Sequence, residues 1–169
     1  EEEILKIKNF DFDEKEPEFF NITTSEPKLY IWRIEQSKLI KWAKVNYGLF
    51  YEGDSFLILK IESESKINAH LWIGKLSTKD EIFFATCKCM QLDNKFNNRC
   101  TIFYEIQGKE SPTFLSYFKI FSYVKANCKS DLEAIKSNRT ITRLFHIHGF
   151  DNRIKVTQIP INKRYITSK

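Results

Sequence analysis

Few residues of this chain have types and spacings suited to catalysis. The closest approach to a reactive cluster is made by two pairs, Cys87 with Cys89 and His146 with His148. Neither spacing matches the ligands of a closed zinc site, and the two pairs lie far apart in the sequence. The sequence also contains no nucleophile elbow, phosphate-binding loop or paired-carboxylate signature. We therefore expect that the protein is not an enzyme.

The chain is organised around a predicted helix over Lys79–Phe96, a stretch without glycine or proline. Ser77 or Thr78 can cap its start. Asp80 and Glu81 lie in the first turn, where carboxylates favour the positive end of the helix dipole. A helix of this length would extend about 27 Å.

Two apolar stripes run along this helix. The stripe suited to packing on a sheet consists of Ile82, Ala85, Cys89, Leu92 and Phe96. The second stripe consists of Phe83, Cys87 and Met90, with Asn94 below them. Together they span roughly 220° of the helix circumference, whereas packing on one sheet needs little more than ~100°. The second stripe is therefore either buried by the protein's own domain or in contact with another protein.

The remaining segments predict strands separated by turns. Strands are expected over Leu29–Glu35, Leu39–Trp42, Ser55–Ile61, Ile67–Ile73, Cys100–Gln107 and Ile120–Val124. A short helix is expected over about 111–118, because Ser111 can cap it and Pro112 suits its first position. These elements predict an α+β fold with a central mixed sheet of five to six strands between the long and the short helix.

The domain organisation follows from the same segments. We expect an acidic N-terminal arm over 1–27, one domain over 28–125, a linker over 126–142 and an incomplete second unit over 143–169. The last unit contains two predicted strands, Arg143–His148 and Arg153–Ile159. A chain of 169 residues suits one domain with tails.

Composition and charge narrow the class of protein. No apolar run approaches the ~18 residues of a membrane span, and no signal peptide opens the sequence. The four cysteines are interpreted as reduced thiols, so we expect a cytoplasmic protein. Residues 1–18 carry a net charge of −5 and residues 136–169 a net charge of +7. Because the positive charge is local and the aromatic residues look like core, nucleic acid is not an expected partner.

Several short motifs resemble the first repeat of the gelsolin family, most closely its severin and fragmin members. They include Ile31-Trp32-Arg33-Ile34-Glu35, Tyr47-Gly48, Gly53-Asp54, Trp72-Ile73-Gly74, Gln91-Leu92-Asp93, Glu105-Ile106-Gln107-Gly108 and Tyr117-Phe118-Lys119. The match runs from about Leu29 to Lys119 in family order and nearly family spacing. It resumes at Arg143-Leu144-Phe145, which resembles the opening of a second repeat.

This resemblance implies a gelsolin-like fold and calcium-regulated binding of actin, with a role in filament capping or severing or in monomer binding, and a location at the cytoskeleton. In the family the long helix wedges into a cleft between two actin subdomains. The residues that would contact actin are Lys79, Asp80, Phe83, Cys87, Met90, Gln91 and Asn94.

The resemblance also implies calcium as a cofactor, at two sites. The internal calcium would be held by the carbonyl of Gly53, the side chains of Asp54 and Glu81, and a carbonyl after the last strand. The second calcium, shared with actin, would be held by the Asp93 side chain and the carbonyls of Asn98 and Cys100. These are the oxygen donors that calcium prefers. In simpler interpretations, Asp54 only terminates a turn and Glu81 only complements the helix dipole.

The basic C-terminal segment supports an alternative function. Arg139, Arg143, Arg153 and Lys155 could contact phosphoinositides, another anionic membrane surface, or the side of an acidic protein filament. The chain would then act as a membrane-binding module rather than as an actin-binding domain.

Overall fold

The computed structural model of the chain describes residues 15–125, 143–150 and 153–159. In chain order its elements are η1 (Pro17–Phe19), β1 (Lys28–Glu35), β2 (Lys38–Lys41), η2 (Lys44–Asn46), β3 (Leu49–Tyr51), β4 (Ser55–Ser63), β5 (Lys66–Ile73), α2 (Lys79–Lys95), β6 (Cys100–Ile106), α3 (Pro112–Leu115), β7 (Ile120–Val124), β8 (Leu144–Phe150) and β9 (Arg153–Ile159). Among these described elements, no helix is long and apolar enough to cross a membrane.

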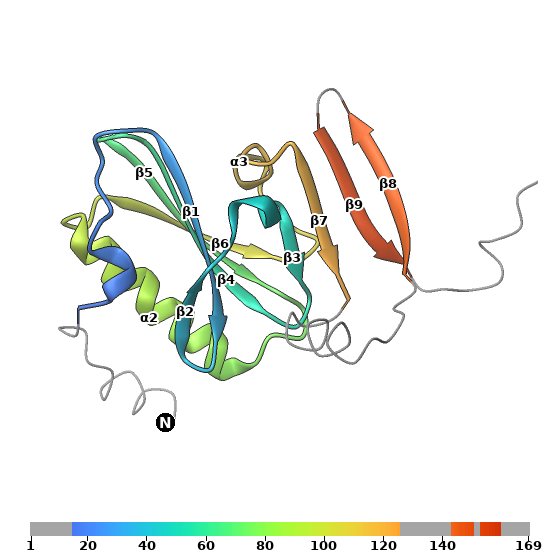
Figure 1. The fold of residues 1–169 in the computed structure, drawn as a ribbon, viewed down its shortest axis with the longest axis horizontal. Helices are drawn as coiled ribbons and strands as arrows, with labels where there is room; N and C mark the ends of the chain where they lie inside the picture. Colours follow the sequence, from blue (N-terminus) through green and yellow to red (C-terminus); the bar gives the residue numbers. More distant parts are fainter. Residues whose placement is uncertain (1–14, 126–142, 151–152, 160–169) are drawn as a thin grey trace, which may run out of the picture.

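The predicted α+β fold is confirmed, with two sheets (Figure 1). The central sheet has the strand order β2-β1-β4-β5-β6, in which β6 is parallel to β5 and the other neighbours are antiparallel. The smaller sheet has the order β3-β7-β9-β8. Each strand predicted over residues 28–125 is present, with ends shifted by at most two residues.

The strand predicted over Ile120–Val124 lies in the smaller sheet, so the central sheet has five strands, within the predicted five to six. This strand is β7, which pairs in parallel with β3, a three-residue strand that the sequence did not reveal. Gly48 permits the pairing: its carbonyl accepts from the Ser122 N–H at 2.7 Å, and its φ of +91° suits glycine. A Cβ at Gly48 would lie 2.1 Å from the carbonyl oxygen of Ile120.

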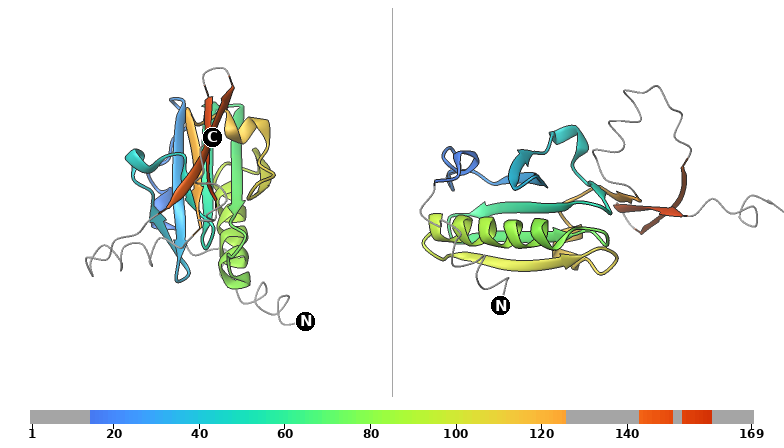
Figure 2. Two further views of the ribbon diagram at one scale, coloured as in Figure 1. Left: turned by 90° about the vertical axis from the view of Figure 1, so that its right-hand side faces the viewer. Right: turned by 90° about the horizontal axis from the view of Figure 1, so that it is seen from below.

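Strand alternation gives the central sheet two apolar faces, each with its own core. Helix α2 lies along one face, as Figure 2 shows. On this face Ala85, Cys89 and Leu92 of the helix pack with residues such as Leu57, Leu59, Ile67, Ala69 and Leu71 of β4 and β5. Four of the five residues of the predicted sheet-facing stripe are therefore in the core; Ile82 is half-buried.

The opposite face is covered by β3, α3 and β7, and its core is aromatic. Phe50 of β3 lies at the centre, fully buried. Its ring centroid is 4.8–5.7 Å from those of Phe56, Trp72, Phe114, Phe118 and Phe121. Helix α3 is shorter than predicted, because the Ser116 N–H is shared between the carbonyls of Pro112 and Thr113 and closes the last turn.

The two strands predicted after residue 142 are β8 and β9, and they extend the smaller sheet. β9 pairs in parallel with β7 from Ile120↔Ile154 to Tyr123↔Thr157. The β8–β9 hairpin has the same spacing as the β1–β2 hairpin. The residue pair next to the turn is Phe150 with Arg153 in the first and Glu35 with Lys38 in the second. The outer face of β7, β9 and β8 is apolar and open. It exposes Ile120, Phe145, Ile147 and Ile154.

Candidate functional site

The first turn of α2 is held by a capping box between Thr78 and Glu81. The Glu81 N–H donates to Thr78 Oγ1 at 3.2 Å, and the Thr78 N–H donates to Glu81 Oε2 at 3.0 Å. The simpler role expected for Glu81, stabilising the helix start, is therefore present. The reciprocal bond uses one of the two carboxylate oxygens and fixes the side chain at the N-terminal end of the helix.

Asp54 lies in the turn before β4, and its side chain is buried. Gly74 packs directly on this turn: its N–H donates to the Asp54 carbonyl at 3.2 Å. A Cβ at Gly74 would lie 2.7 Å from that oxygen and 2.4 Å from the carbonyl oxygen of Glu52. The connection from β5 into α2 can approach the turn only because residue 74 has no side chain, and this brings Asp54 to the end of the sheet where α2 begins.

The end of β7 reaches the same corner, because the Glu52 N–H donates to the Val124 carbonyl at 2.9 Å. The segments predicted to supply the internal calcium ligands therefore converge. They are the turn with Gly53 and Asp54, the start of α2 with Glu81, and the end of the last strand of the first unit. Within residues 15–125, 143–150 and 153–159, no group of three or more His, Cys, Asp or Glu side chains could hold a metal. A site here would need carbonyl oxygens beside two carboxylates, a donor set that fits calcium.

The other end of α2 is folded back onto Asp93. The Asp93 carbonyl accepts from the N–H groups of Phe96 and Asn98, at 2.9 and 3.0 Å, and Asp93 Oδ1 accepts from the Cys100 N–H at 2.8 Å. Asn97 and Asn98 both have φ of 56°, a left-handed conformation that asparagine tolerates. The tight turn brings together the three residues predicted to bind the shared calcium: Asp93, Asn98 and Cys100.

The thiols at this end of the helix are held neutral. Burial, reinforced by the Asp93 carboxylate, raises the pKa of Cys100 to about 12 and that of Cys89 to about 12. Neither side chain is therefore suited to bind metal as a thiolate near neutral pH. What Cys100 can offer a hard cation is its backbone carbonyl.

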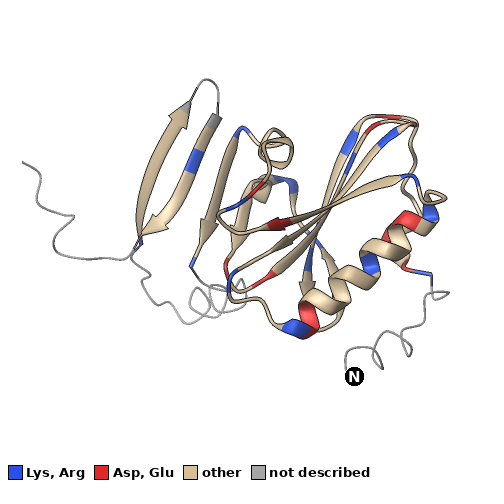
Figure 3. Ribbon diagram, turned by 180° about the vertical axis from the view of Figure 1, so that it is seen from behind, with Lys and Arg blue, Asp and Glu red and all other residues tan. Residues whose placement is uncertain are grey.

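The outward face of α2, where the second stripe lies, is only partly open. Met90 is 47% exposed, whereas Cys87 is 2% exposed and Gln91 7%. The neighbouring Lys88 is also buried, and its Nζ lies 2.8 Å from Glu16 Oε2, so Glu16 lies against this flank of the helix. Figure 3 shows charged residues at both ends of α2 and a basic residue between them.

The seven residues expected to contact actin therefore differ in accessibility. Lys79, Asp80, Met90 and Asn94 are exposed, Phe83 is half-buried, and Cys87 and Gln91 are buried. Burial raises the pKa of the Cys87 thiol, an effect that the nearby Lys88 ammonium opposes. Whether each residue contacts actin stays a prediction.

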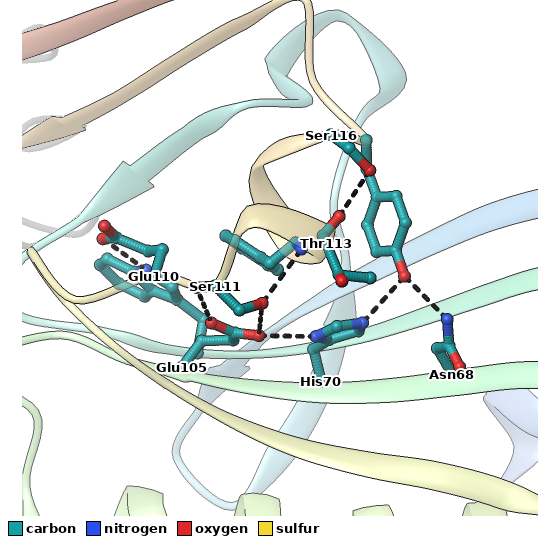
Figure 4. A network of polar contacts seen from close by, with 10 residues as sticks. Asn68, His70, Glu105, Glu110, Ser111, Thr113 and Ser116 are labelled. Atoms are coloured by element: carbon teal, nitrogen blue, oxygen red, sulfur yellow. Dashed lines mark hydrogen bonds and ion pairs between the residues drawn. The ribbon is translucent and has the colours of Figure 1, made fainter.

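A buried polar network that the sequence did not predict lies between the central sheet and α3 (Figure 4). His70 Nδ1 is 2.9 Å from Glu105 Oε1, and His70 Nε2 is 3.0 Å from the Tyr117 hydroxyl. The Ser111 N–H and hydroxyl both donate to Glu105 at 2.7 Å. Burial lowers the pKa of His70 although the Glu105 carboxylate favours the charged ring. The network fixes the start of α3 on the sheet, a structural role.

Of the four basic residues proposed for lipid or filament contact, the structure describes the side chains of Arg143 and Lys155. The Lys155 Nζ lies 3.3 Å from Glu110 Oε2, and the Glu110 side chain is almost fully buried. The partly exposed Lys155 side chain is thus paired with a buried carboxylate. Arg143 is half-buried, only the backbone of Arg153 is described, and Arg139 lies outside the described residues.

Residues 36–115 match the model of the gelsolin repeat. The chain is 32% identical over 139 residues to gelsolin-like protein 2 of Lumbricus terrestris, a match that covers 79% of this chain and 38% of that protein. It is 33% identical over 143 residues to macrophage-capping protein of Rattus norvegicus, covering 82% and 41%. It is also 33% identical over 149 residues to gelsolin of Gallus gallus, covering 85% and 19%.

Among solved structures, the fold resembles that of a chain in the complex of Thorarchaeota 2DGel3 with rabbit actin. The TM-score is 0.50 at 20% identity, covering 84% of this chain and 68% of the other. This likeness supports the fold. The chain spans 38%, 41% and 19% of the lengths of the three relatives above. The matched motifs, the two-sided sheet with its long helix and the family model agree: the chain carries a gelsolin repeat and belongs to the gelsolin family.

Proposed function

We propose that this protein is a calcium-dependent actin-binding domain of the cytoskeleton, which contributes to filament capping or severing or to monomer binding. It would insert the outward face of α2 into an apolar cleft of actin. Membership of the gelsolin family and the name of the macrophage-capping relative support this assignment. A membrane-binding function has less support, since Lys155 of its basic set is paired inside the protein.

The main structural support for the proposal is helix α2, which is packed firmly on the sheet and presents an apolar side chain outward. The helix is seated on the sheet by Ala85, Cys89 and Leu92, so it is held rigidly by the core. Its outward face presents Met90, an exposed flexible apolar side chain, between the half-buried Phe83 and the exposed Asn94. A rigid helix with apolar anchors suits binding in a groove.

Calcium would act at the two ends of this helix. At the N-terminal end, Asp54, Glu81 and the Gly53 carbonyl would hold the internal ion. At the C-terminal end, Asp93 and the carbonyls of Asn98 and Cys100 would hold the ion shared with actin. The ion would supply positive charge that links these carboxylates, and at the shared site it would link one of them to actin.

Glu81→Gln tests the internal site. Glutamine can still accept the Thr78 N–H, so the helix start should survive. Because the carboxylate charge is lost, we expect calcium affinity of the free protein to fall about tenfold or more, from a dissociation constant within roughly 10⁻⁷–10⁻³ M. Isothermal titration measures this change. Asp80→Asn, an exposed neighbour in the same turn, is the matched control. An unchanged affinity in Glu81→Gln would show that Glu81 is not a ligand.

Asp93→Asn tests the shared site. The amide oxygen can still accept the Cys100 N–H, so the turn should keep its shape. We expect actin affinity in calcium to fall about tenfold, while calcium uptake by the free protein stays as in the wild type, because one carboxylate with two carbonyls is a poor site until a partner adds ligands. Equal losses in both measurements would contradict a site shared with actin.

Function itself is tested by actin co-sedimentation and by fluorescence-based depolymerisation, each run in calcium and in chelator. Binding that requires calcium supports the proposal. Faster depolymerisation indicates severing, protection of filament ends indicates capping, and retention of actin in the supernatant indicates monomer binding. Equal binding in calcium and chelator would contradict calcium dependence while leaving actin binding intact.

A further inference from the structure

A buried cation lies beside the proposed internal calcium site. Arg33 of β1 is 5% exposed, and its Cα partner on β4 is Phe56. Since side chains alternate along a strand, Arg33 and Glu35 lie on the same face of the sheet, and Asp54 lies in the turn directly before β4. Arg33 Nη1 is 3.9 Å from Asp54 Oδ1, and Arg33 Nη2 is 2.5 Å from Glu35 Oε2.

The two contacts of this guanidinium differ in kind. The contact with Glu35 is a short charge-assisted hydrogen bond. The contact with Asp54 is too long for a hydrogen bond, so those two groups are coupled by charge alone. Within the part of the chain that the structure describes, Arg33 Nε has no hydrogen-bond partner. A guanidinium stays charged at all relevant pH values, and a charge that is shielded from water acts strongly on its neighbours.

We propose that Arg33 is a built-in competitor of calcium for Asp54. Without calcium, the guanidinium compensates the buried Asp54 carboxylate. With calcium, its charge opposes the incoming ion and lowers the affinity of the site. Glu35, which is half-buried and hydrogen-bonded to the other guanidinium nitrogen, keeps Arg33 paired when Asp54 turns to the ion. Arg33 is thus a positioning residue that sets the calcium threshold. This inference rests on the proposed function, in which Asp54 is a calcium ligand.

The first test needs no calcium. Arg33→Met, Asp54→Asn and the double variant are compared by urea unfolding in chelator. If Arg33 compensates Asp54, the loss of stability caused by Asp54→Asn is smaller in the Arg33→Met background than in the wild type. Additive effects of the two substitutions would show no coupling and would overturn the inference.

The second test is a calcium titration of the same proteins by calorimetry. We expect Arg33→Met to bind calcium about tenfold more tightly than the wild type, because a like charge beside the ion is removed. Arg33→Lys keeps the charge and should stay within about threefold of the wild type. Lys44→Met removes the same charge from an exposed position on η2 and should have no effect.

If Arg33→Met does not fold in chelator, Arg33→Lys and Glu35→Gln replace it in the titration. Removing the Glu35 charge leaves the guanidinium less compensated, so the calcium affinity of Glu35→Gln should fall.

The outcomes separate this inference from the proposed function. Calcium binding by the wild type with an unchanged affinity in Arg33→Met overturns the role of Arg33 and leaves the calcium site standing. If Arg33→Met binds calcium and the wild type does not, Arg33 competes so strongly for Asp54 that it prevents calcium binding. If neither protein takes up calcium, both the site and the competitor are wrong.

Discussion

Cys87→Asp is expected to lower the unfolding free energy by about 3 kcal/mol, because it places a charge in a buried position of α2. The Cys87 side chain is 2% exposed. Its surroundings already disfavour negative charge, since burial raises the pKa of the thiol. Lys88, the nearest cation in sequence, is itself paired with Glu16. Urea unfolding followed by far-ultraviolet circular dichroism measures the change.

Cys87→Ser is the control, since it keeps the size of the side chain without the charge and should cost about 1 kcal/mol. A change below about 0.5 kcal/mol in Cys87→Asp would mean that the flank of α2 is open in solution. In that case Cys87 would be available to actin, and the contact of Lys88 with Glu16 would not close the face.

Met90→Asp should leave the stability of the protein almost unchanged and weaken its binding to actin. Met90 is 47% exposed, so the charge remains hydrated in the free protein and stability should change by no more than about 0.5 kcal/mol. In complex with actin the carboxylate would be desolvated in an apolar cleft. We expect affinity to fall about thirtyfold, equivalent to about 2 kcal/mol, as measured by co-sedimentation in calcium.

Val45→Asp is the matched control for that loss. Val45 is 90% exposed on η2, away from α2, and takes the same apolar-to-charged change. It should leave actin binding unaltered, and Met90→Leu should bind almost as the wild type does. Full actin binding by Met90→Asp would remove the outward face of α2 from the proposed interface.

Local sequence signals predicted the framework of the site. The bounds of α2 and its cap at Thr78 each depend on residues within one or two turns of the helix. Period and capping are properties of such short segments, so a single sequence carries them. The same holds for the strand segments of the central sheet.

Features that depend on contacts between distant segments could not be predicted from such local signals. The closure of the α2 flank needs Glu16, which lies 72 residues from Lys88. Strand β3 is short, and its identity rests on Gly48 approaching Ile120. The charges at Arg33 and Asp54 become neighbours only through the pairing of β1 with β4. Each of these contacts is set by tertiary packing, which secondary-structure propensity does not describe.

The parallel pairing of β7 with β9 has a mechanical consequence. The end of β9 lies beside the end of β7, where the Lys125 N–H donates to Gln158 Oε1 at 2.9 Å. The adjacent Val124 carbonyl accepts from the Glu52 N–H, two residues before Asp54. Tension applied to the chain beyond Ile159 would therefore enter the fold beside Asp54, where we propose the internal calcium site. In the proposed calcium-bound state, pulling force and the ion would act on the same few backbone bonds, so a stretched chain and a relaxed one would hold the ion with different strength.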